Sequence, residues 1–97
     1  MLFTTDLVIA EIIWVLESYY ELPKNDVREK VEKILNTTNL ICQQKDIILN
    51  ALNVYTEKNI DYIDAFNAMI ILEKGIEELY SYDPHYNRIE GLTRLEP

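Results

Sequence analysis

The run Leu7-Val-Ile-Ala-Glu11-Ile-Ile-Trp-Val-Leu16 reads as a helix that is apolar on every side and carries one carboxylate. A helix without a polar face is normally buried all round. A carboxylate inside such a helix is costly unless it is neutralised, paired or bound to a metal ion. The sequence therefore predicts a buried helix over this run and makes Glu11 a candidate metal ligand.

The composition predicts one small globular domain covering residues 1–97. The chain is 48% hydrophobic and 27% charged, which is typical of a folded protein and leaves room for a single core. Only two glycines and three prolines are present, so helices with short connections are favoured over an all-β fold.

The charge and cysteine content restrict the partners. A formal net charge of −8 excludes a basic nucleic-acid-binding surface, so a role on RNA needs metal ions or a basic patch from a partner. Alternatively, the charge only maintains solubility. Cys42, the single cysteine, is expected to be a small buried filler, and the run 7–16 is too short to span a bilayer. A cytoplasmic protein without a membrane partner fits these features.

The hydrophobic pattern predicts four helices and three short strands in an α/β arrangement. The expected helices run from Thr4 or Thr5 to about Tyr20, from Pro23 to about Leu35, from Asp46 to Lys58, and from about Asp61 to Gly75. The expected strands are 40–42, 79–82 and 92–95. Strands separated by helices favour parallel pairing. The chain is expected to start directly on a helix.

Two further acidic segments are candidates to meet Glu11. Asp61 and Asp64 share one face at the start of the fourth helix, where each is either a helix-stabilising acid or a ligand. Asp83 follows the strand 79–82, where ligand sites of open α/β sheets lie, although an Asp-Pro pair is also an ordinary turn. Oxygen-only ligands select Mg²⁺ or Mn²⁺ rather than zinc.

Four segments, in order along the chain, resemble PIN-domain proteins and especially the VapC-type ribonuclease toxins: Thr4–Tyr20, Asn59–Ala65, Tyr80–Asp83 and Arg88–Pro97. The resemblance implies a three-layer α/β fold with a short parallel sheet flanked by helices. It implies an endoribonuclease dependent on Mg²⁺ or Mn²⁺, in which Glu11, Asp64 and Asp83 are catalytic and metal-binding and Asp61 is an additional acid. It also implies an RNA substrate and an antitoxin partner. A homodimer or higher oligomer is expected because apolar surface must be covered.

The sequence departs from the family pattern in two places. Related chains often carry a second acid in the tail, and in this sequence that position is occupied by His85. The sequence does not decide whether His85 is a turn residue or a ligand. The family also begins with a strand ending in an aspartate, which is not found here, so the chain is expected to be an N-terminally truncated, partial PIN-like domain. The alternative function is therefore a catalytically inactive remnant that dimerises or binds a partner. A small helical adaptor unrelated to nucleases is a third hypothesis.

Overall fold

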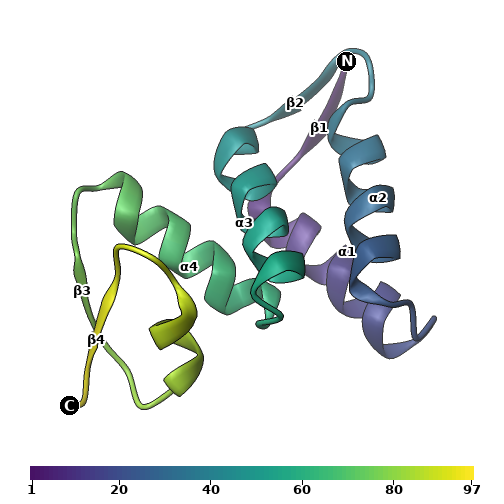
Figure 1. The fold of residues 1–97 in the computed structure, drawn as a ribbon. Coiled ribbons are helices and arrows are strands. Elements are labelled where there is room, and N and C mark those ends of the chain that lie inside the picture. The colour runs from purple at the N-terminus through teal and green to yellow at the C-terminus, as the bar shows by residue number, and fades with distance from the viewer. The chain divides into compact units, whose positions relative to one another are not determined.

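The computed structural model describes residues 1–97 and shows an α/β chain with parallel strands (Figure 1). In chain order the elements are β1 (Leu2–Thr4), α1 (Asp6–Ser18), α2 (Lys24–Leu35), β2 (Leu40–Cys42), α3 (Lys45–Glu57), α4 (Tyr62–Glu73), β3 (Glu78–Tyr80), the 3₁₀ helix η1 (Pro84–Arg88) and β4 (Thr93–Leu95). β1 pairs with β2 and β3 pairs with β4, both in parallel. The predicted fold class and parallel pairing are therefore confirmed.

The chain divides into two compact units, Met1–Leu49 and Asn50–Pro97, and the division falls within α3. Each unit contains one of the two-stranded ladders. In the first unit α1 packs against α2 (Figure 1). The residues that are buried on these two helices form one stripe on each: Ile9 and Ile13 on α1, and Val27, Val31 and Leu35 on α2. The buried residues of α2 follow an i, i+4, i+8 spacing, which places them on one face of the helix.

The prediction that α1 is buried all round is wrong. Leu7 is 78% exposed and Trp14 is 65% exposed. Glu11 is also exposed. A neighbouring helix covers only one stripe of α1, because packed helices meet along a narrow line of side chains. Glu11 is thus a solvated acid, and only the family resemblance still points to it as a ligand.

A strand precedes the first helix, contrary to the expectation that the chain starts on a helix. Leu2–Thr4 pairs in parallel with Leu40–Cys42. A strand of three residues is too short to show an alternating pattern, so periodicity cannot identify it. Cys42, the last residue of β2, is half-buried, so the expectation that it is a small buried filler is wrong. Its partial burial, and next the charge of Asp6, raise the pKa of its thiol.

Thr5 is the N-cap of α1, one of the two positions predicted. Its hydroxyl accepts a hydrogen bond from the backbone N–H of Val8 at 3.2 Å. Thr5→Ala is expected to lower the free energy of unfolding by about 1 kcal/mol, because it leaves that N–H without its protein acceptor. Urea titration followed by circular dichroism measures the change, and Thr5→Ser should retain the wild-type stability. Equal losses in both variants would contradict the capping role.

The second unit buries a core that supports α4. Its buried apolar residues come from α3, the turn after it, α4 and the segment around η1: Ala51, Leu52, Tyr55, Ile60, Tyr62, Ala65, Ala68, Tyr86, Ile89 and Leu92. The rings of Tyr55 and Tyr62 meet edge to face with centroids 6.3 Å apart. The guanidinium of Arg88 donates to the backbone oxygen of Asn59 at 3.0 Å, which ties η1 to the turn before α4.

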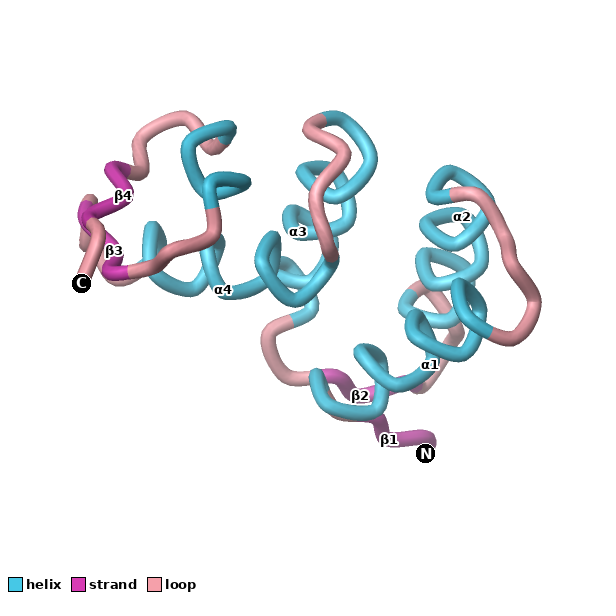
Figure 2. The backbone as a smooth tube through the Cα atoms, turned by 90° about the horizontal axis from the view of Figure 1, so that it is seen from below, coloured by secondary structure: helices cyan, strands magenta, loops and turns pink.

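The later elements lie close to their predicted positions. α3 begins at Lys45, one residue before the predicted Asp46, and α4 ends just before Gly75, whose φ of +77° is a backbone conformation that glycine adopts without strain. Figure 2 shows β3 and β4 side by side beyond α4. The 3₁₀ helix η1 is not predicted. None of the helices combines the length and the apolar character that crossing a membrane requires.

Candidate metal centre

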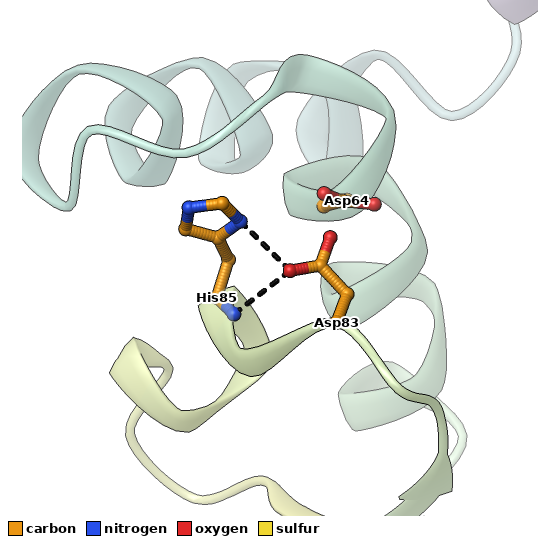
Figure 3. A group of neighbouring side chains, drawn as sticks. All are labelled: Asp64, Asp83 and His85. Carbon is orange, nitrogen blue, oxygen red and sulfur yellow. Dashed lines mark hydrogen bonds and ion pairs between the residues drawn. The ribbon is translucent and has the colours of Figure 1, made fainter.

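Three metal-ligating side chains meet in the second unit. Asp64 lies in the first turn of α4, Asp83 caps η1, and His85 lies in η1. One ligand atom from each lies within 4.8 Å of the other two. In Figure 3 one oxygen of the Asp83 carboxylate bonds to His85 and the other points toward Asp64. Because ligands on opposite sides of a small divalent ion are about 4.2 Å apart, this spacing is close to that of a shared cation.

Local hydrogen bonds fix the position of Asp83. Its Oδ1 accepts from the backbone N–H of His85 at 2.9 Å, and its own N–H donates to the hydroxyl of Ser81 at 3.0 Å. An aspartate that accepts from the residue two positions on is a common turn device. The backbone hydrogen bond from His85 is the main cause that lowers the pKa of Asp83. Asp83 is therefore a turn residue, and the same carboxylate faces the other members of the cluster.

Asp64 lies in a less favourable electrostatic environment. Its Oδ1 accepts a hydrogen bond from the hydroxyl of Tyr86 at 3.2 Å. Burial raises the pKa of Asp64, and its contact with Asp83 raises it further. Two carboxylates this close repel each other when both are ionised. A divalent cation bound between them would cancel that repulsion, so this donor set fits Mg²⁺ or Mn²⁺.

The imidazole of His85 completes the cluster. Its Nδ1 lies 2.7 Å from Oδ1 of Asp83. The sequence does not decide whether His85 is a turn residue or a metal ligand. The structure places His85 in η1, with a ring nitrogen within 4.8 Å of ligand oxygens of Asp64 and Asp83. Sequence reasoning misses Tyr86 and Ser81. The turn signal Asp83-Pro-His85 could have indicated that His85 lies close to Asp83. Nothing in the sequence distinguishes Tyr86 from the other tyrosines.

The other two predicted acids lie elsewhere. Asp61 is the exposed N-cap residue of α4 and makes no side-chain capping bond, but its charge contributes to the raised pKa of Asp64. Glu11 belongs to the first unit, whereas the cluster belongs to the second. The structure thus brings together Asp64 and Asp83, and the roles of Glu11 and Asp61 stay predictions.

Comparison with known proteins identifies the family. The PIN domain matches residues 1–92, and the chain belongs to the PIN-domain family. It is similar to a protein named VapC ribonuclease from Aquifex aeolicus (strain VF5), with 27% identity over 96 residues that cover 99% of this chain and 70% of the relative. No solved structure matches the chain. The predicted family is confirmed, and the hypothesis of an unrelated helical adaptor is set aside.

Proposed function

We propose that this protein is a metal-dependent endoribonuclease of the VapC toxin type. The observation that carries the proposal is the close approach of Asp64, in the first turn of α4, to Asp83, which follows β3, in a chain of the PIN-domain family. In the proposal these two acids and Glu11 hold Mg²⁺ or Mn²⁺, and Asp61 adds negative charge nearby. With a net charge of −8, the protein needs such a cation to accept a phosphodiester.

The side chains around the pair have separate tasks in this mechanism. Tyr86 is buried and donates to one oxygen of Asp64, which fixes the rotation of that carboxylate. Ser81 and the backbone of His85 hold Asp83 through two hydrogen bonds. A divalent ion, when bound, supplies Lewis acidity for the attacking water and positive charge beside the phosphate. The protein contributes a preorganised set of donors, which costs no rearrangement during the reaction.

Removing divalent metal is expected to abolish RNA cleavage. Protein dialysed against EDTA should cleave a fluorescent single-stranded RNA roughly 10³-fold more slowly, and added Mn²⁺ or Mg²⁺ should restore the rate, because only a cation can offset the carboxylates facing the phosphate. Circular dichroism before and after dialysis controls for unfolding. Cleavage that persists at full rate in EDTA would sink the proposal.

An apolar surface on α1 is an argument for a protein partner. It is also an argument for the alternative function, a catalytically inactive module that binds a partner. A hollow of about 260 Å³ on α1 is lined by the exposed residues Val8 and Glu11 and by three half-buried apolar residues, Ile12, Val15 and Leu16. Apolar surface rimmed by polar groups often marks a protein interface. We propose that an antitoxin or a second copy of the chain, in a homodimer or higher oligomer, covers this surface in the cytoplasm. A monomer by sedimentation with full metal-dependent activity would rule out the alternative.

A further inference from the structure

The only histidine of the chain lies in the carboxylate cluster. The side chain of His85 is 44% exposed, so no core packing dictates the orientation of its ring. Its backbone N–H already satisfies the capping oxygen of Asp83 at 2.9 Å. The ring nevertheless turns back to the same oxygen, with Nδ1 at 2.7 Å. The turn itself needs only the backbone bond, so this side-chain contact with Asp83 is an additional interaction that places Nδ1 beside the carboxylates.

The spacing of the donors suits a shared ion. Neighbouring ligands of a divalent ion are about 3.0 Å apart and opposite ligands about 4.2 Å apart, when each bond is near 2.1 Å. The shortest distance in the cluster, 2.7 Å between Nδ1 of His85 and Oδ1 of Asp83, is slightly below the spacing of neighbouring ligands. The upper limit of 4.8 Å between ligand atoms of Asp64, Asp83 and His85 is slightly above the spacing of opposite ligands. Small rotations of the side chains are enough to reach them. Without a metal ion the short contact needs a proton on Nδ1, which donates to Asp83. A bound ion would take the place of that proton, and the ring would keep its proton on Nε2.

An imidazole changes the preference of an oxygen site. Mg²⁺ is a hard ion that selects oxygen ligands, whereas imidazole nitrogen binds better to transition metals, and affinity rises from Mn²⁺ through Co²⁺. Building on the proposed ribonuclease function, we propose that His85 is a nitrogen ligand of the divalent ion and shifts the preference of the site from Mg²⁺ toward Mn²⁺ and Co²⁺. An oxygen ligand at this position would leave the preference nearer to Mg²⁺.

Metal binding and electron paramagnetic resonance test this role without any activity assay. Dissociation constants for Mn²⁺ and Mg²⁺ are measured by calorimetry on tag-free wild type, His85→Asp and His85→Asn. His85→Asp is expected to lower the ratio of Mn²⁺ to Mg²⁺ affinity roughly tenfold. Spin-echo modulation from a directly bound ¹⁴N should appear with Mn²⁺ in the wild type and vanish in both variants. Because the chain has one histidine, an imidazole signal has a single assignment.

Control variants separate this inference from the proposed function. Asp64→Asn should weaken the binding of both metals, and Asp46→Asn, an exposed acid in the first turn of α3, should change neither. If Mn²⁺ binds through Asp64 but shows no ¹⁴N modulation, and His85→Asp leaves the affinity ratio unchanged, His85 is not a ligand and the proposed function stands. If the wild type binds neither metal, both proposals fail.

Discussion

Asp64→Asn and Asp83→Asn are both expected to reduce RNA cleavage roughly 10³-fold or more, yet only Asp83→Asn is expected to lower thermal stability. Each substitution removes one negative ligand from the proposed metal site and keeps the shape of the side chain. The loss of activity follows from the shared site. The stability difference follows from the two carboxylates having opposite pKa shifts in the folded protein.

Asp64→Asn is expected to leave the melting temperature unchanged or to raise it in metal-free buffer. Burial and the nearby Asp83 raise the pKa of Asp64, so its ionised form is less favourable in the folded state than in the unfolded chain. The contribution of the protonated carboxyl to stability is present at low pH and is lost as pH rises through the folded-state pKa, which makes the ionised carboxylate a cost at neutral pH. Asparagine removes this cost, and its side-chain oxygen can still accept from Tyr86.

Asp83→Asn is expected to lower the melting temperature under the same conditions. The hydrogen bonds from His85 lower the pKa of Asp83. The resulting stabilisation is present above the ordinary pKa of a carboxyl group and is lost as pH falls through the folded-state value. Asparagine can still cap the turn, but it lacks the negative charge that the hydrogen bonds from His85 stabilise in Asp83.

Calorimetric melting in EDTA at neutral pH and cleavage assays with Mn²⁺ measure both effects. Asp46→Asn serves as a control, since Asp46 is an exposed acid of the first unit, and it should retain activity and stability. Two inactive variants with equally lowered melting temperatures would indicate that folding, rather than the metal site, is damaged. Full activity in either variant would remove that residue from the site.

The sequence predicts two members of this cluster, Asp64 and Asp83, because both acids lie at recognisable places. Asp64 is in the first turn of a helix with a clear apolar pattern, and Asp83 follows a short strand, so both positions can be read from local rules. The hydrogen bond from Tyr86 to Asp64 joins residues 22 positions apart. No periodic pattern reports a contact of that kind. The identity of a buried supporting side chain therefore appears only in the structure.

The errors in the fold have a common physical cause. Periodicity reports which face of an element is apolar, but it does not report whether a neighbour covers that face. Trp14 and Leu7 are apolar and exposed because α2 covers only the stripe of Ile9 and Ile13. Very short elements, such as the three-residue strand β1 and the five-residue 3₁₀ helix η1, are too short to show a hydrophobic period. Their formation depends on the partner strand or on capping hydrogen bonds.

Tyr55→Ala is expected to lower the free energy of unfolding by about 3–5 kcal/mol, the largest stability effect predicted for this chain. Tyr55 is fully buried in the second unit, and its ring meets that of Tyr62 edge to face. Tyr62 in turn stacks on Phe66 with ring centroids 6.1 Å apart. Truncation leaves a cavity beneath the first turns of α4, the helix that positions Asp64, so the site should loosen with the core.

Tyr80→Ala provides the matched control, because Tyr80 lies in the same unit but is 70% exposed, and its truncation should change stability by no more than about 0.5 kcal/mol. Urea denaturation at neutral pH measures both variants. If Tyr55→Ala populates an unfolded fraction at room temperature, Tyr55→Leu should recover part of the loss by refilling the cavity. Equal stability of Tyr55→Ala and Tyr80→Ala would mean that the aromatic cluster does not stabilise the helix that presents Asp64.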